Sequence, residues 1–477
     1  MAHSIFNDII GPLMRGPSSS HTAASWRIAR FCIFALNEPL AKAVVEFDKD
    51  GSWATNYEEQ GTVMGINGGL LELDITDPIM KNTKFELKNK GIDVKYLISS
   101  FENDHPNSIL ITLYGKHENK IKVLAASLGG GAFEIQKIND LKISFKGDSF
   151  ALLSKQDETY WFSTSLTKPS TSAAEIIIPP ILPIIPISTP PKHFDGVEDC
   201  INHCKDGNIT LGDAGLDYEE SISGIPVIDL QSKMQDLIDL IHHSIDIGLK
   251  GTSYDDRILP AQAPLIRKAE KNGSIAGNSI INRIIENVTA IMDSKSAMEV
   301  FVANPTAGSS GTIGGVLRAF SEEMETSEAD LIKAYFAAGI CGIYFAKGPG
   351  FSAEEHGCQV ECGAASAMAA AGLVQLMGGN TDQAFGAASM ALQNMLGLIC
   401  DPVADRVEVP CLGKNVSAAV NAYSSAIMIM SGFDKVIPYQ EVIDSVINVS
   451  KQMPSCVKCT GLGGLSITET SRKLKVN

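Results

Sequence analysis

The sequence has few basic residues. Its 477 residues include 39 Lys and Arg against 55 Asp and Glu, which gives a formal net charge of −16 at pH 7. A protein that binds the phosphate backbone of a nucleic acid needs a basic excess to displace counterions, and this composition provides none. We therefore expect no nucleic-acid partner.

Long hydrophobic runs are also missing. The longest apolar stretch, residues 176–187, is shorter than the roughly 20 residues that span a bilayer, and it contains Pro179, Pro180, Pro183 and Pro186. The first ten residues lack the basic stretch followed by an apolar stretch that marks a secretory leader. These two absences predict a cytoplasmic protein with no membrane partner.

The ten cysteines do not form a standard local metal motif. In a cytoplasmic chain of this size, cysteines are more often inert, catalytic or metal-binding than paired in disulfides. Zinc sites and common ferredoxins use short spacings such as C-x2-C. Cys358, Cys400 and Cys411 are 42 and 11 residues apart, so their spacing alone is weak support for a metal site.

The N-terminal part of the chain has the pattern of a small α+β domain. Short β-rich runs at residues 43–47, 108–114, 122–126 and 141–145 are separated by Gly, Asn and Asp. This alternation predicts an antiparallel sheet in a domain that covers residues 1–150.

The rest of the chain predicts a strap followed by a helical domain. Six prolines between residues 175 and 196 exclude a helix or a central strand, so residues 151–212 are interpreted as a Pro-rich linker that packs on protein. Long amphipathic or Ala-rich stretches then predict a mostly α-helical domain over residues 213–477.

A Ser-rich segment lies near the N-terminus. Ser18, Ser19, Ser20, His21 and Thr22 directly precede an apolar-periodic stretch, where hydroxyl groups cap helices and free backbone N–H groups bind carboxylates. The alternative is an ordinary capped helix start in which His21 has no chemical role.

A second segment of small polar residues is Thr306-Ala307-Gly308-Ser309, which follows Pro305. Such a turn can offer backbone N–H groups to an anion. It can equally be a loop between two helices.

The three widely spaced cysteines differ from the others in their surroundings. Cys358, Cys400 and Cys411 lie beside Gly, Pro or Asp, whereas Cys32 and Cys341 lie in apolar runs typical of buried structural thiols. Three thiolates can hold a [4Fe–4S] cluster and leave one iron open as a Lewis acid. That arrangement would allow loss of a β-hydroxyl group without pyridoxal phosphate.

Taken together, the motifs resemble those of the iron–sulphur L-serine dehydratases, and the resemblance covers most of the chain. The first is GPSSSHT at residues 16–22. The remaining motifs, in chain order, are His105-Pro106-Asn107, SLGGG at 127–131, and the segments 304–311, 357–361, 400–403, 407–411 and 460–465. Their order is similar to that of the fused single-chain members of the family.

The resemblance implies a PLP-independent lyase with a [4Fe–4S] cluster ligated by Cys358, Cys400 and Cys411. It implies that a small amino-acid substrate loses its hydroxyl group and then ammonia, and we keep a homodimer as an expectation. It also implies that residues 140–154 are the remnant of a regulatory domain. The substrate-binding residues that it implies are Ser18, Ser19, Ser20, Thr22, Gln60, His105, Asn107, Thr306, Ala307, Gly308 and Ser309.

Several residues depart from the family pattern. Gln60 stands where an active-site histidine is expected, and glutamine cannot act as a general base near pH 7. Cys459 replaces a glutamate, and one hypothesis is that it approaches the fourth iron as an internal plug. His356, Asp405 and Arg406 replace small or apolar residues.

These departures leave three interpretations open. The protein eliminates from a different small amino acid (threonine, cysteine or a modified serine), with His21 or His356 as the acid/base. It keeps L-serine with a rearranged base. Or it is a non-catalytic protein that binds an amino acid or a cluster. We favour elimination from a small amino acid, and among the substrates we favour L-serine most.

Overall fold

The fold is described from a computed structural model of the chain. Contacts between residues divide it into two compact units, which are treated separately: a sheet unit, Met14–Pro186, and a helical unit made of Met1–Leu13 and Ile187–Asn477. The described residues are 3–55, 57–105, 107–117, 119–156, 159–170, 175–181, 185–187, 191, 194–255, 257–277 and 279–475. Parts of the predicted strap, and Pro106, lie outside them.

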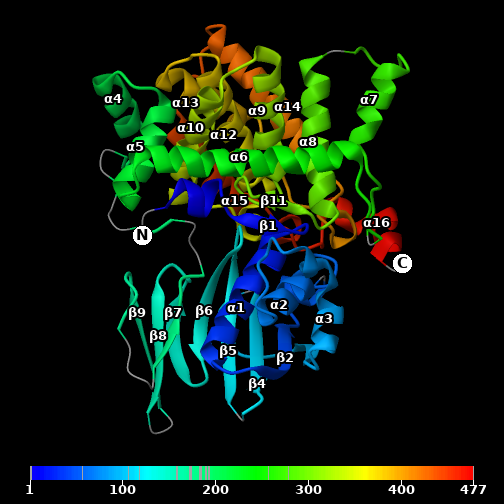
Figure 1. The fold of residues 1–477 in the computed structure, drawn as a ribbon. Coiled ribbons are helices and arrows are strands. Elements are labelled where there is room, and N and C mark those ends of the chain that lie inside the picture. Colours follow the sequence, from blue (N-terminus) through cyan, green and yellow to red (C-terminus); the bar gives the residue numbers. More distant parts are fainter. Residues whose placement is uncertain are drawn as a thin grey trace. The chain divides into compact units, whose positions relative to one another are not determined.

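The sheet unit is built on a six-stranded sheet with strand order β3-β2-β4-β5-β6-β7. Helices α1 (Ala24–Leu36) and α2 (Thr62–Leu70) pack together, and α1 lies against β4, β5 and β6 (Figure 1). The strands are β2 (Leu40–Asp48), β3 (Asp93–Ser99), β4 (Ser108–Gly115), β5 (Lys120–Gly129), β6 (Ala132–Ile138) and β7 (Leu141–Phe145).

The sheet is antiparallel except at one edge. β2 runs parallel to β3, and the connection between them includes α2 and α3 (Thr83–Asn89). The predicted fold class is confirmed. The sequence predicted an antiparallel sheet, and the parallel pair of β2 and β3 was not expected. A parallel neighbour requires a crossover rather than a tight turn, and helices supply that crossover here.

A smaller sheet follows, with strand order β10-β8-β9. Its strands are β8 (Phe150–Gln156), β9 (Thr159–Ser165) and β10 (Glu175–Ile178). β10 comes directly before Pro179 and Pro180 and pairs only with β8 among the strands of this sheet. An edge position is where a strand that ends in proline is tolerated, because proline cannot donate to a ladder.

The helical unit is organised around α12, an Ala-rich helix that contacts α9, α10, α13 and α14. Figure 1 shows these helices in gold to orange. The helices of the unit are α4 (Val197–Gly207), α5 (Leu211–Ser223), α6 (Val227–Lys250), α7 (Ala263–Lys271), α8 (Ile280–Ser296), α9 (Ser310–Met324), α10 (Glu328–Lys347), α11 (Ala353–His356), α12 (Cys362–Leu376), α13 (Thr381–Gln393), α14 (Cys411–Met430), α15 (Tyr439–Gln452) and α16 (Glu469–Lys475).

Small residues on α12 let the neighbouring helices approach closely. A Cβ atom added to Gly372 would lie 3.0 Å from the Ala334 carbonyl oxygen of α10. By length and composition alone α10 could cross a membrane, but 72% of its apolar stretch is buried inside the structure. We therefore interpret α10 as a core helix.

The first residues of the chain are anchored in the helical unit by a buried carboxyl group. Glu219 of α5 is fully buried, accepts a hydrogen bond from the Ile5 amide at 3.0 Å and also bonds to the Ser4 hydroxyl. Burial raises the pKa of Glu219 to about 8, although the bonds from Ser4 and Ile5 lower it. At neutral pH this carboxyl is therefore mostly protonated.

This anchor predicts a pH-dependent stability. An unfolded glutamate ionises near pH 4.5, so between that pH and about 8 the folded chain holds a proton that the unfolded chain has released. The free energy of unfolding should then fall as pH rises through this window, by as much as about 1.4 kcal/mol for each pH unit. Glu219→Gln, which cannot ionise, should flatten this slope in urea unfolding measured from pH 5 to 8.5. An unchanged slope would contradict the assignment.

Candidate active site

Four cysteine side chains pack in one cluster of the helical unit. Cys358, Cys362 and Cys400 are buried there, and the half-buried Cys459 packs against them. They come from separate segments: Cys358 begins a 3-10 turn (Cys358–Val360), Cys362 begins α12, and Cys400 follows α13. The neighbouring Cys358 and burial raise the pKa of the Cys362 thiol, and the neighbouring Cys459 and burial raise that of the Cys400 thiol.

Cys411 joins this region through the start of α14, of which it is the first residue. Asn415, one turn later, donates from Nδ2 to the Cys411 carbonyl oxygen at 2.9 Å and to Cys362 Sγ at 3.7 Å. Burial raises the pKa of the Cys411 thiol to about 12, whereas the charges of Lys295 and Lys414 lower it. The two lysines therefore favour the thiolate form that a metal requires.

The turn at residues 305–309 is tied to the same region. Asn415 Nδ2 donates to the Gly308 carbonyl oxygen at 2.7 Å, and Lys295 Nζ donates to the Ala307 carbonyl oxygen at 3.1 Å. Both Asn415 and Lys295 are fully buried. The structure thus brings the predicted turn and the predicted cysteines together within one unit.

Glu361 lies between the turn and the cysteines. The Thr306 hydroxyl donates to Glu361 Oε1 at 2.7 Å, and a Cβ atom on Gly308 would lie 2.7 Å from that oxygen, so the close approach requires glycine. The Ser309 hydroxyl, 3.1 Å from Thr306 Oγ1, donates to the Asn304 carbonyl oxygen at 3.1 Å. Burial raises the pKa of Glu361 to about 7, although the bond from Thr306 lowers it.

A buried ion pair fixes the Cys400 segment to α14. Lys414 Nζ lies 2.6 Å from Asp401 Oδ1 and donates to the Ile399 carbonyl oxygen at 2.7 Å. Burial opposes the charged form of Lys414, but the charges of Cys358, Asp401 and Cys411 outweigh it and raise its pKa. The two chain segments that carry Cys400 and Cys411 are therefore held by one ammonium group.

His356, at the end of α11, faces charged side chains. Its Nε2 atom lies 3.5 Å from Glu355 Oε2, and its side chain is 17% exposed. Burial lowers its pKa, and the charge of Lys458 lowers it further, against a raising effect of Glu355.

The remaining predicted residues belong to the sheet unit. Ser18 and Ser20 hydroxyls lie 2.9 and 3.2 Å from His21 Nδ1, and the His21 ring lies 6.2 Å from that of Trp53. Ser19 and Thr22 belong to the same π-helical turn, Ser19–Ala23. This turn packs against α1, α2 and β5, and all of its residues are buried.

Hydrogen bonds link the π-helical turn and β5 to three further predicted residues: Gln60, His105 and Asn107. Thr22 Oγ1 donates to the Gln60 carbonyl oxygen at 3.0 Å. The Asn107 amide donates to His105 Nδ1 at 3.1 Å, and the Asn107 carbonyl oxygen accepts from the Ser127 amide on β5 at 3.0 Å. Because β5 also contacts the π-helical turn, these residues gather at one end of the sheet.

The donor set of the helical unit fits an iron–sulphur cluster in its chemistry. Thiolates are the usual ligands of such clusters, and Cys358, Cys400 and Cys411 are free thiols held by separate elements near two lysines. Within the described ranges, no three His, Cys, Asp or Glu side chains are grouped as a site for a metal ion. The ligands of an iron–sulphur cluster bind different irons and need not surround a single ion. The fit therefore rests on the kind of donor present.

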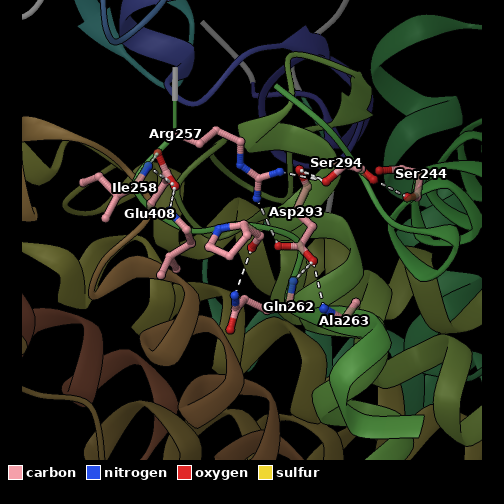
Figure 2. A network of polar contacts seen from close by, with 11 residues as sticks. Ser244, Arg257, Ile258, Gln262, Ala263, Asp293, Ser294 and Glu408 are labelled. Carbon is pink, nitrogen blue, oxygen red and sulfur yellow. Dashed lines mark hydrogen bonds and ion pairs between the residues drawn. The ribbon is translucent and has the colours of Figure 1, made fainter. Parts of the chain in front are cut away.

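A polar network supports the segment that leads to Cys411 (Figure 2). The Glu408 carboxylate accepts from the Ile258 amide at 3.1 Å and from the Leu259 amide at 2.8 Å. The same loop reaches α8 through Arg257, whose Nη2 lies 3.2 Å from Asp293 Oδ1. Residues 257–259 therefore join α8 to the segment before Cys411.

Asp293 also holds the start of α7. Its Oδ2 atom accepts from the Gln262 amide at 2.7 Å and from the Ala263 amide at 2.8 Å. Its side chain is 1% exposed and that of Arg257 is 5% exposed. Desolvation raises the pKa of Asp293, while these amides and Arg257 lower it.

Sequence reasoning assigned no role to Lys295, Glu361, Lys414 and Asn415. Lys295 is in the last turn of α8, where a lysine is typical of an exposed helix end. Glu361 belongs to the motif at residues 357–361 and follows Cys358 by three residues, and this spacing could have indicated that it lies near the thiol. Lys414 and Asn415 follow Cys411 by about one helical turn, which was the corresponding signal on α14.

Comparisons with known proteins agree on one family. The family model of the serine dehydratase alpha chain matches residues 109–466. The probable L-serine dehydratase alpha chain of Bacillus subtilis is 33% identical over 282 residues, which cover 59% of this chain and 94% of the relative. L-serine dehydratase 2 of Escherichia coli is 27% identical over 473 residues, which cover 95% of this chain and 96% of the relative.

The Asp293 network generates a stability prediction. Asp293→Ala would leave the buried Arg257 guanidinium without its counter-charge and two amides without an acceptor, so we expect a loss of about 3–5 kcal/mol in the free energy of unfolding. Asp382→Ala is the control, because the Asp382 side chain is 55% exposed in its pair with Lys435, and such pairs contribute about 0–1 kcal/mol. Equal losses for the two variants in urea unfolding would contradict the prediction.

Proposed function

Because the chain belongs to the serine dehydratase family, a family of lyases, we propose that it is an iron–sulphur-dependent dehydratase. Its substrate is L-serine or a related small amino acid. The observation that carries the proposal is the set of free thiols Cys358, Cys400 and Cys411, of which Cys411 is tied through Asn415 to the turn at residues 305–309. The relatives named L-serine dehydratase support the same assignment.

Cys358, Cys400 and Cys411 would hold a [4Fe–4S] cluster. When bound, this group supplies a Lewis-acidic iron that weakens the bond between the β-carbon and the hydroxyl oxygen of the substrate. Lys295 and Lys414 favour the thiolate form of Cys411. No pyridoxal phosphate is needed in this proposal.

The turn at residues 305–309 is suited to the substrate carboxylate. It leads directly into α9, and the first N–H groups of a helix favour an anion. Thr306 and Ser309 add hydroxyl groups on the same turn, and Lys295 holds its backbone through Ala307.

The reaction balances without an external oxidant or reductant. Loss of the α-proton and the β-hydroxyl group releases one water and leaves an enamine. The enamine becomes an imine, and one water hydrolyses it to a 2-oxo acid and ammonia. His21, in the sheet unit, and His356, in the helical unit, stay the predicted acid/base groups. The predicted substrate-binding residues of the sheet unit also stay as predicted: Ser18, Ser19, Ser20, Thr22, Gln60, His105 and Asn107.

A changed substrate remains the second candidate function. It is favoured by Gln60 and by Cys459, which takes the position of a family glutamate and packs against the cluster that contains Cys400. We also propose that the protein works in the cytoplasm as a homodimer, with no nucleic-acid or membrane partner. A monomeric mass in light scattering would contradict the dimer.

The cluster proposal predicts that iron content depends on three cysteines. After anaerobic purification, Cys358→Ser, Cys400→Ser and Cys411→Ser should each lose most bound iron and acid-labile sulphide. Cys341→Ser is the control, because Cys341 is buried in α10 away from this cluster. A variant that keeps full iron removes its cysteine from the ligand set.

The substrate proposal predicts equal amounts of a 2-oxo acid and ammonia from one member of a small panel. The panel contains serine, threonine, cysteine and their phosphorylated or acylated forms, assayed with anaerobic protein of known iron content. We expect L-serine to give the highest kcat/KM. Iron-loaded protein that binds a panel member without releasing ammonia would favour a non-catalytic amino-acid-binding protein instead.

A further inference from the structure

Cys400 and Cys459 are held side by side by the backbone. The Cys400 amide donates to the Val457 carbonyl oxygen at 2.9 Å, and the Cys459 amide donates to the Cys400 carbonyl oxygen at 3.1 Å. These bonds form a parallel bridge between Cys400 and Lys458. Two residues that are far apart in the sequence are thus fixed as neighbours.

Their side chains meet as well. Cys459 packs against the buried cluster that contains Cys400, and both thiols are free. Cys400 is 6% exposed, whereas Cys459 is half-buried. Cys459 is thus the more exposed member of the pair and the one that a reagent in solution meets first.

The rest of the C-terminal segment is fixed to the residues that follow Cys400. The Leu465 amide donates to Asp401 Oδ2 at 2.9 Å, and the Ser466 hydroxyl donates to the Pro402 carbonyl oxygen at 2.7 Å. Farther along, the Ala404 amide donates to Ser471 Oγ at 2.8 Å, and Lys475 forms an ion pair with Asp405. These bonds keep the two thiols together, so joining them requires little further loss of chain entropy.

We propose that Cys400 and Cys459 form a disulfide in the cluster-free protein when it meets a low-molecular-weight disulfide oxidant of the glutathione type. The Cys459 thiolate attacks one sulfur of the oxidant, forms a mixed disulfide and releases one glutathione thiolate. The Cys400 thiolate then attacks the Cys459 sulfur and releases the second glutathione. Two protein thiols are oxidised, two protons are released to solvent, and the oxidant is reduced to two thiolates.

This inference rests on the proposed function in one respect, namely that Cys400 is a cluster ligand. The disulfide would remove Cys400 from the ligand set and make iron uptake depend on a reductant. It would also protect the empty site, because sulfur held in a disulfide is less exposed to oxidation to sulfinic acid.

Other thiol pairs are poorer candidates because the oxidant cannot reach them. Cys358 and Cys362 are 4% and 0% exposed, and Cys200 and Cys204 on α4 are 0% and 3% exposed. Cys456 is half-buried, as Cys459 is, and therefore makes a matched control.

The test uses the full-length protein freed of iron by anaerobic chelation. It is treated with oxidised glutathione, alkylated and digested without reduction, and its peptides are identified by mass spectrometry. We expect one cross-linked species that joins the peptides of Cys400 and Cys459. Cys456→Ser should keep this species and Cys459→Ser should lose it. A Cys456–Cys459 bond, a stable glutathione adduct on Cys459, or alkylated Cys400 would each overturn the proposal.

A second measurement separates this inference from the proposed function. Iron and sulphide are supplied to the oxidised protein with and without prior reduction. We expect the wild type to take up iron only after reduction, and Cys459→Ser to take it up in both cases. If reduced protein binds no iron although the cross-link forms, the cluster proposal fails and the disulfide stands. If iron uptake by the oxidised wild type needs no reductant, the regulatory consequence fails.

Discussion

The ammonium group of Lys414 is the point at which three segments of the helical unit meet. It pairs with Asp401 and bonds to the Ile399 carbonyl oxygen, while the second oxygen of Asp401 accepts from the Leu465 amide. Charges removed from water are tolerated only where they are paired and hydrogen-bonded. This requirement fixes α14, the Cys400 segment and the C-terminal segment to one another, and the positions of the cysteines depend on it.

Buried polar groups also explain how distant segments are held in register. Asn415 joins Gly308 to Cys411, Lys295 holds the Ala307 carbonyl oxygen, and Glu408 anchors the loop at residues 258–259. In each case a side chain satisfies backbone groups of a segment that has no regular structure. A loop built this way keeps its shape without forming a helix or a strand, as a binding segment requires.

Local patterns in the sequence were enough to predict the fold class. The runs at residues 108–114 and 141–145 became β4 and β7 because a short β-rich run bounded by turn residues is a local property. The parallel pairing of β2 with β3 and the bridge between Cys400 and Lys458 have no local signature, since they depend on chain segments that meet only after folding. Lys295 was missed for the same reason: its burial is decided by the elements packed around α8.

The chain enters the helical unit, leaves it and returns. Ser4 and Ile5 precede the whole sheet unit in the chain, yet their partner Glu219 follows it. On the ribosome, residues 14–186 are complete before α5 has been synthesised, so the sheet unit can form while the N-terminal segment still lacks its binding site. The apolar side chains of Ile5, Phe6 and Ile9 then remain exposed until synthesis reaches α10. Order of synthesis thus separates these side chains from the helix that covers them for as long as the sheet unit takes to be made.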